Sequence, residues 1–133
     1  MEEKINMKII SQEVIIAAKP KEVYDAFMDE KQHTKFTGAR AKIENVVGGK
    51  FEVWDGYASG KNIELKDGEK IVQSWRASDW PEGVESEITI ELIAENENAK
   101  LVFHQKNVPD DFVEDVKQGW EYFYWEPLQE YFE

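Results

Sequence analysis

The strongest hydrophobic pattern in the sequence lies near its end, at residues 111–132. Apolar side chains recur there at helical spacing, so they share one side of an α-helix. They are Phe112, Val116, Trp120, Phe123 and Tyr131, with Val113 and Tyr124 beside them. A helix with one apolar side needs a surface that covers it. The pattern therefore predicts a long helix, capped by Asp111 and kinked late by Pro127, that packs against the rest of the chain.

Most of the preceding chain alternates between apolar and polar residues, which is typical of β-strands with one buried face. In the clearest pair of strands, Ile88, Ile90 and Leu92 lie on one face and are matched by Leu101 and Phe103. The predicted strands cover residues 8–18, 41–44, 51–54, 57–66, 70–77, 84–94 and 99–108. Turns are expected at Gly48-Gly49, at Asp67-Gly68 and at residues 95–98.

Two short helices are predicted between the first two strands. Pro20 suits a first helical turn, and Val23, Tyr24 and Phe27 follow at helical spacing, which favours a helix at 20–28. Residues 29–37 are predicted to form a second short helix or turn. We therefore expect an α+β fold in which one curved antiparallel sheet, of about six or seven strands, wraps around the long C-terminal helix.

The composition of the sequence limits the cellular compartments and the binding partners that are plausible for this protein. A length of 133 residues suits a single domain over residues 1–133. The formal net charge of −12 argues against nucleic acid and anionic membranes, which both need a cationic surface. The sequence has no cysteine, no secretory signal and no apolar run that could span a bilayer, so we expect a cytoplasmic protein.

No catalytic or metal-binding constellation stands out. His33 and His104 are far apart in the sequence, one in a helix or turn and the other on the solvent face of a strand. Two distant histidines without cysteine match no metal-ligand spacing, and no cofactor is predicted. Among the charged residues, Arg76 is expected to form an ion pair with Asp55 or Glu64.

Three clusters of residues resemble one known family. They are residues 51–57 with 60–65, residues 71–76 with 78–83, and Gln118-Gly119-Trp120 continued by Tyr124, Glu126, Leu128 and Phe132. In this order they resemble the C-terminal domain of the activators of the heat-shock protein 90 ATPase, and the single-domain bacterial proteins similar to it. This family belongs to the START-like, helix-grip superfamily. The resemblance runs from the first strand to the last residue and implies a helix-grip fold.

The same resemblance implies a place for a binding site. In the superfamily, the space between sheet and long helix is often a cavity for lipids, polyketides or other apolar molecules, and some members are enzymes that act there. The eukaryotic activators make a principal contact with the chaperone through a separate N-terminal domain, which we expect a chain of 133 residues to lack.

The candidate site is the set of side chains that should face one another between sheet and helix. These side chains either fill a core or line a pocket, and a filled interior is the preferred interpretation. Gln73, the polar member, needs a hydrogen-bond partner from protein, water or a ligand. The nine residues are Phe51, Val53, Gln73, Trp75, Ile90, Phe103, Trp120, Phe123 and Tyr124.

A second stripe on the helix is formed by Tyr122, Trp125 and Phe132. We expect the two short helices to cover it; the alternative is an exposed patch that binds a protein partner. Gly56 and Gly60 are expected to mark a bulge or a close backbone approach.

Three functions remain open at this point. The first is a non-enzymatic binder of a small apolar or amphipathic ligand in the cavity between sheet and helix. The alternative is a chaperone accessory in the stress response that uses loop aromatics and an acidic surface to bind a protein partner. An enzyme such as a cyclase or hydrolase ranks last. The ligand and the oligomeric state stay open.

Overall fold

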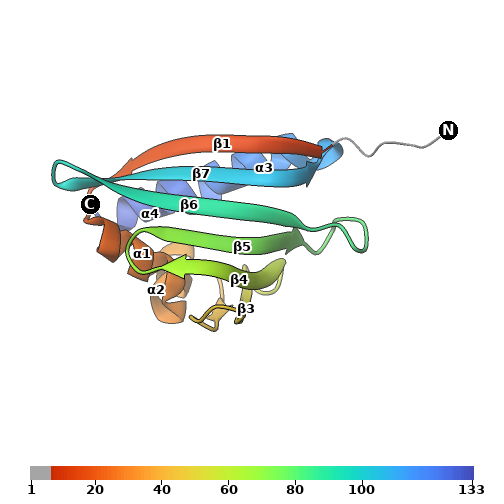
Figure 1. The fold of residues 1–133 in the computed structure, drawn as a ribbon, viewed down its shortest axis with the longest axis horizontal. Helices are drawn as coiled ribbons and strands as arrows, with labels where there is room; N and C mark the ends of the chain where they lie inside the picture. The colour runs from red at the N-terminus through yellow and green to blue at the C-terminus, as the bar shows by residue number, and fades with distance from the viewer. Residues whose placement is uncertain (1–6) are drawn as a thin grey trace.

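In the computed structural model, which describes residues 7–133, seven strands form one antiparallel sheet in the order β1-β7-β6-β5-β4-β3-β2. The first strand forms one edge of the sheet and pairs with the last strand (Figure 1). The strands are β1 Met7–Ile16, β2 Lys42–Ile43, β3 Lys50–Val53, β4 Ala58–Lys66, β5 Lys70–Ala77, β6 Ser86–Glu95 and β7 Asn98–Pro109. The predicted antiparallel sheet is therefore confirmed.

Two short helices follow β1, as predicted, and a longer helical segment follows β7. Figure 1 shows this last segment running behind β1, β7 and β6. It begins with a turn of 3-10 helix and contains a π-helical turn between two α-helices. The helices are α1 Pro20–Met28, α2 Glu30–Thr37, the 3-10 turn Asp110–Phe112, α3 Val113–Trp120, the π turn Glu121–Trp125 and α4 Glu126–Tyr131. The predicted cap by Asp111 is wrong, because neither the 3-10 turn nor α3 begins with a side-chain cap.

The turns between strands contain residue types that accept positive φ angles, as the sequence predicts. Gly68 has φ +73°, a conformation that suits glycine, and it joins β4 to β5 at the predicted place. Asn96 has φ +58° in the turn between β6 and β7. At Gly60 a Cβ atom would lie 1.8 Å from the carbonyl oxygen of Ser74, so β4 and β5 can approach there only because the residue is glycine. The predicted close approach at Gly60 is confirmed.

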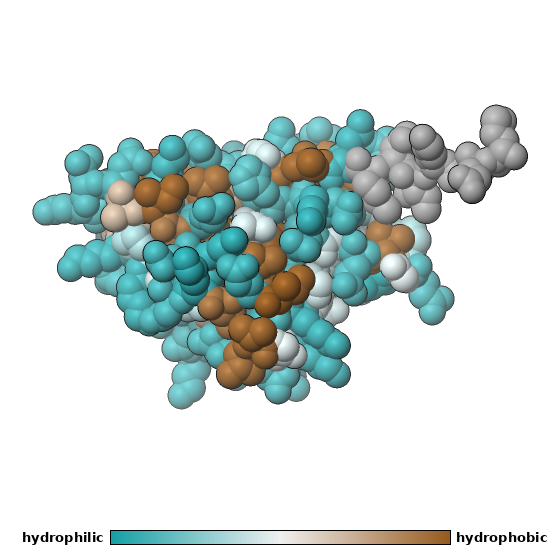
Figure 2. All heavy atoms as spheres, viewed as in Figure 1, coloured by the Kyte–Doolittle hydropathy of each residue, from teal (hydrophilic) through white to brown (hydrophobic). Residues whose placement is uncertain are grey.

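The sheet buries one face and exposes the other. Ile88, Ile90 and Leu92 are buried as their alternation predicts. The face that carries no helix is mainly hydrophilic, with apolar side chains in separate groups (Figure 2). Isolated isoleucines such as Ile63 and Ile93 remain about half exposed. The core therefore lies between the sheet and the helices.

The predicted helix register holds up to Trp120 and for Tyr124, and it is wrong for Phe123 and Trp125. Val116 and Trp120 are buried, but Phe123 is 54% exposed, while Trp125 and Leu128 are buried. A π turn places more residues in each turn than an α-helix does, so the residues after it are rotated about the helix axis. The π turn ends just before Pro127, where the prediction placed a kink. Its extra residue brings Trp125 to the sheet instead of Phe123.

The predicted covering of the second stripe is therefore wrong for Trp125. Its indole nitrogen donates a hydrogen bond of 2.8 Å to Gln12 Oε1 on β1, and its ring stacks on Trp120 at 5.3 Å. Tyr122 is 56% exposed and is not covered by the short helices. Trp125 thus belongs to the sheet side of the helix, while Tyr122 lies on its outer side.

Candidate functional site

The space directly between sheet and helix is a packed core with Trp120 at its centre. The Trp120 ring lies 4.5 Å from Phe103, 4.6 Å from Tyr124 and 5.7 Å from Trp75, measured between centroids. Its indole nitrogen donates to Gln105 Oε1 at 2.8 Å. The gap that remains in this region has a volume of about 10 Å³, room for no more than about one water molecule.

Gln73 faces the interior as predicted, and its partner is protein. Its side-chain amide donates a hydrogen bond of 2.9 Å to Asn62 Oδ1. Asn62 in turn donates to the carbonyl oxygens of Glu44 and Val46, at 2.7 Å and 3.0 Å. This buried pair connects β4 and β5 to the loop before β3. The amide nitrogen of Gln73 is therefore already engaged by protein.

A second buried polar chain runs through His33, which α2 places against the π turn. His33 Nδ1 lies 2.8 Å from the carbonyl oxygen of Phe27, so Nδ1 carries the hydrogen, and Nε2 accepts from the Tyr124 hydroxyl at 3.0 Å. Burial lowers the pKa of His33 to about 4 and raises the pKa of Tyr124 above its usual range. Both groups are therefore held neutral at pH 7.

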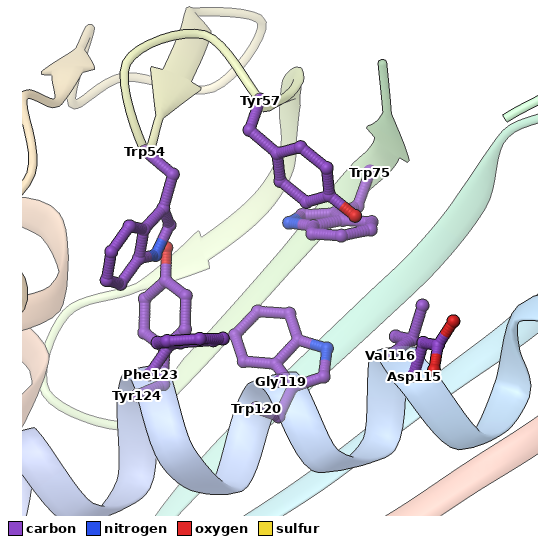
Figure 3. Close-up of a pocket in the computed structure, with 9 residues that line it drawn as sticks. All are labelled: Trp54, Tyr57, Trp75, Asp115, Val116, Gly119, Trp120, Phe123 and Tyr124. Atoms are coloured by element: carbon purple, nitrogen blue, oxygen red, sulfur yellow. The ribbon is translucent and has the colours of Figure 1, made fainter. Parts of the chain in front are cut away.

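A cleft of about 330 Å³ lies between α3 and the turn that joins β3 to β4. Figure 3 shows aromatic rings from both sides of this cleft pointing into it. The residues that line it are Trp54, Tyr57, Trp75, Asp115, Val116, Gly119, Trp120, Phe123 and Tyr124. The site is thus an aromatic cleft at the side of the packed core, and we call it the aromatic cleft below.

The turn between β3 and β4 positions two of the aromatic walls. Trp54, Asp55 and Gly56 have φ values of +55°, +56° and +90° in succession, so the chain reverses sharply and carries Trp54 toward the helix. The Asp55 amide donates to the carbonyl oxygen of Arg40 at 3.0 Å, which ties the turn to the segment after α2. Trp54 then meets Phe123 edge-to-face at 5.1 Å.

The structure separates the nine predicted site residues into three groups. Four line the aromatic cleft: Trp75, Trp120, Phe123 and Tyr124. Phe51, Val53 and Gln73 surround the small interior gap, together with several of the cleft residues. Ile90 and Phe103 are buried in the core.

The prediction missed Trp54, Tyr57, Asp115, Val116 and Gly119 as cleft residues. Two signals were available: Val116 belongs to the predicted apolar side of the helix, and Gly119 is a glycine inside a strong helical pattern.

The charged residue that lines the aromatic cleft is Asp115. On the opposite wall, the pKa of Tyr57 is raised by burial and, after that, by the negative charges of Asp79 and Asp115. The electrostatic potential at the mouth of the cleft is therefore negative.

The predicted ion pairs of Arg76 are wrong. Its guanidinium donates instead to three backbone carbonyls in the loop that follows β5 and so shapes that loop. Glu64 pairs with Lys70 at 3.5 Å, and the Asp55 carboxylate accepts from the Arg40 amide at 3.3 Å. The three carbonyls belong to Trp80, Pro81 and Val84.

Other kinds of site are not found in the part of the chain that the structure describes. Within residues 7–133, no three metal-binding side chains of His, Cys, Asp or Glu come together. His104 lies exposed on β7, as predicted, where Nδ1 is 3.0 Å from Ser11 Oγ. No helix in the same range is long and apolar enough to cross a bilayer.

Comparison with known proteins points to one family. A family model described as Activator of Hsp90 ATPase homolog 1-like protein matches residues 17–133. Human Activator of 90 kDa heat shock protein ATPase homolog 1 is 34% identical over 125 residues, which cover 94% of this chain and 37% of the human protein. The Dictyostelium discoideum homolog is 36% identical over 104 residues, 76% of this chain and 27% of its own length. The chain therefore spans about a third of the length of these curated relatives.

Solved structures agree with this match. The crystal structure of an HSP90 activator from Plasmodium falciparum superposes with a TM-score of 0.86 at 26% identity, covering 92% of this chain and 94% of that chain. The Aha1 dimer from Colwellia psychrerythraea, at 21% identity and a TM-score of 0.76, shares the fold over 87% of this chain and 90% of its own. The resemblance seen in the sequence is confirmed: this chain belongs to the family of activators of the heat-shock protein 90 ATPase, with a helix-grip fold.

Proposed function

We propose that this protein is a chaperone accessory that binds an ATPase of the heat-shock protein 90 class and raises its rate of ATP hydrolysis. The observation that carries the proposal is the family match, which extends over residues 17–133 and includes relatives named as activators. Because the chain spans about a third of those relatives, the proposal concerns the share of the activity that this module supplies. A cytoplasmic location and a single domain over residues 1–133 stay predictions.

The surface beside the aromatic cleft supports a protein contact. Tyr57, Tyr122 and Phe123 are 44%, 56% and 54% exposed, on the turn and on the helix that flank the cleft. Large aromatic side chains that remain exposed mark contact sites, and tyrosine is enriched among the residues that dominate binding energy. The net charge of −12 favours a partner with a basic surface.

The test is the ATPase rate of a heat-shock protein 90 chaperone with and without the purified protein. We expect the rate to rise and to saturate with added protein. Phe123→Ala is expected to weaken binding by about tenfold, equivalent to about 1.4 kcal/mol, because a large aromatic contact is removed. Ile93→Ala is the matched control, since Ile93 is 47% exposed on β6, away from the cleft residues. No rise in rate and no binding at saturating protein would refute the proposal.

The aromatic cleft also favours a second candidate function, the binding of a small apolar or amphipathic ligand. Its volume of about 330 Å³ falls at the lower end of the range of ligand sites, about 300–1,000 Å³, whereas the interior gap is far too small. The proposed site is therefore the cleft and not the space under the sheet. We propose binding and no reaction at this site.

Filling the cleft tests this second candidate. A side chain at Gly119 would project into the cleft, and its Cβ atom would meet no atom closer than Phe123 Cδ2 at 3.9 Å. Gly119→Leu is expected to lower the affinity for the neutral probe N-phenyl-1-naphthylamine at least tenfold, while replacing a helical glycine raises stability by up to about 1 kcal/mol. Lys117→Leu adds the same side chain at an exposed position of α3 and should leave binding unchanged. Equal probe affinity in wild type and G119L would place the ligand elsewhere.

A further inference from the structure

The floor of the aromatic cleft is bare helix backbone at Gly119. Glycine is the least favourable residue in a helix interior after proline, because it leaves the backbone free in the unfolded chain. Nothing among the described residues requires it there: its φ is not positive, and a Cβ atom would have open space around it. What glycine supplies at this position is room for another group to approach the helix closely.

The walls of the cleft present aromatic rings to this space. Trp54 and Phe123 meet at 5.1 Å on one side, and Trp75 and Trp120 meet at 5.7 Å on the other. Figure 3 shows these rings arranged above the helix segment that contains Gly119. The faces of aromatic rings carry partial negative charge and attract a cation that comes within about 6 Å. The ring faces that border the cleft therefore favour a positively charged guest over a negatively charged one.

The carboxylates near the cleft also favour a positively charged guest. Asp115 lines the cleft, and Asp79 acts on Tyr57 at its rim. Within residues 7–133, neither carboxylate forms an ion pair with a lysine or arginine. Arg76, on the strand that carries Trp75, is occupied by three backbone carbonyls. The part of the protein that the structure describes thus places negative charge at the cleft and pairs it with no lysine or arginine.

From the glycine floor, the aromatic walls and the unpaired carboxylate, we infer that the aromatic cleft binds a small organic cation. The guest is an alkyl- or arylammonium whose apolar body lies against the rings and whose charge lies near Asp115. This inference rests on the proposed ligand-binding function and adds to it the chemical class of the ligand. An anion of the same shape is rejected, because it would meet both the ring faces and the carboxylate.

The test compares two probes that differ in charge and share one shape. Benzyltrimethylammonium carries the cation, and neopentylbenzene has carbon in place of the nitrogen. Titrations followed by tryptophan fluorescence and by the indole N–H signals of an NMR spectrum are expected to show at least tenfold tighter binding of the ammonium. In the variant Asp115→Asn this preference should fall below about threefold, while the affinity for neopentylbenzene stays the same.

Glu114→Gln is the matched control. It removes the same charge from the same turn of α3 at an exposed residue that does not line the cleft, and it should retain the tenfold preference. If both probes bind equally and D115N changes neither, the cation inference is wrong while the ligand-binding function stands. If neither probe binds at millimolar concentration, both proposals fail. A preference that falls equally in D115N and E114Q would also overturn the inference, since it would reflect the overall charge of the protein.

Discussion

Replacing Trp120 by alanine is expected to lower the free energy of unfolding by about 3–5 kcal/mol. The side chain is 3% exposed and packs against four other aromatic rings, so its removal leaves a cavity in the centre of the core. The substitution also leaves Gln105 Oε1 without the hydrogen bond that it accepts from the indole nitrogen. A buried polar atom without a partner adds its own desolvation cost of about 1–3 kcal/mol.

Urea unfolding of wild type and Trp120→Ala measures this difference directly. Tyr122→Ala is the control, because Tyr122 lies in the next turn of the same helical segment but is 56% exposed. The control is expected to change stability by no more than about 0.5 kcal/mol. A loss of less than about 1 kcal/mol in W120A would mean that the helix is not held against the sheet through this residue.

Acidification from pH 7 to pH 4 is expected to remove about 3 kcal/mol of stability through His33 alone. Burial lowers the pKa of His33 to about 4 in the folded protein, from its ordinary value of 6.5. As the pH falls through this interval, the unfolded chain takes up the proton first, which draws the equilibrium toward unfolding. The contribution is complete above the unfolded pKa and is lost as the pH approaches 4. A protonated ring would also present an N–H group to Tyr124 in place of the acceptor that its hydroxyl now uses.

The contribution of His33 is isolated by comparing wild type with His33→Gln at pH 7, 6, 5 and 4. The amide of glutamine keeps one donor and one acceptor but does not titrate. The stability gap between the two proteins is expected to shrink by about 3 kcal/mol toward pH 4. The exposed imidazole of His104 provides the control, and H104Q should keep the profile of the wild type. A gap that stays constant with pH would show that His33 is not held neutral by burial.

The sequence was sufficient for the order of elements and for the sheet. The alternation at Ile88, Ile90 and Leu92 predicts a strand with one buried face, and the Asp67-Gly68 pair predicts the turn that joins two strands. These signals are local, because each depends on residues a few positions apart. They predicted an antiparallel sheet of about six or seven strands, two short helical segments after the first strand and the burial of Trp120. The structure confirms them with seven strands and two helices.

The polar partners in the interior could not be read from the sequence. Gln73 was predicted to face inward, but its partner Asn62 lies on a neighbouring strand, and the irregular register between β4 and β5 decides that they meet. His33 and Tyr124 are separated by most of the chain and meet only because α2 packs beside the π turn. Such pairs depend on how whole helices and strands are placed relative to one another. The periodic pattern of apolar residues carries no information about that placement.

The sequence by itself determined that an apolar helix is covered by a curved antiparallel sheet, because hydrophobic periodicity directly encodes which face of each element is buried. The tertiary structure alone decided where the aromatic cleft lies. One π turn exchanges Phe123 for Trp125 against the sheet, and one turn with positive φ angles carries Trp54 to the helix. Both are irregularities of a single turn. They leave a packed core, which was the preferred interpretation of the interior, with an aromatic cleft at its side.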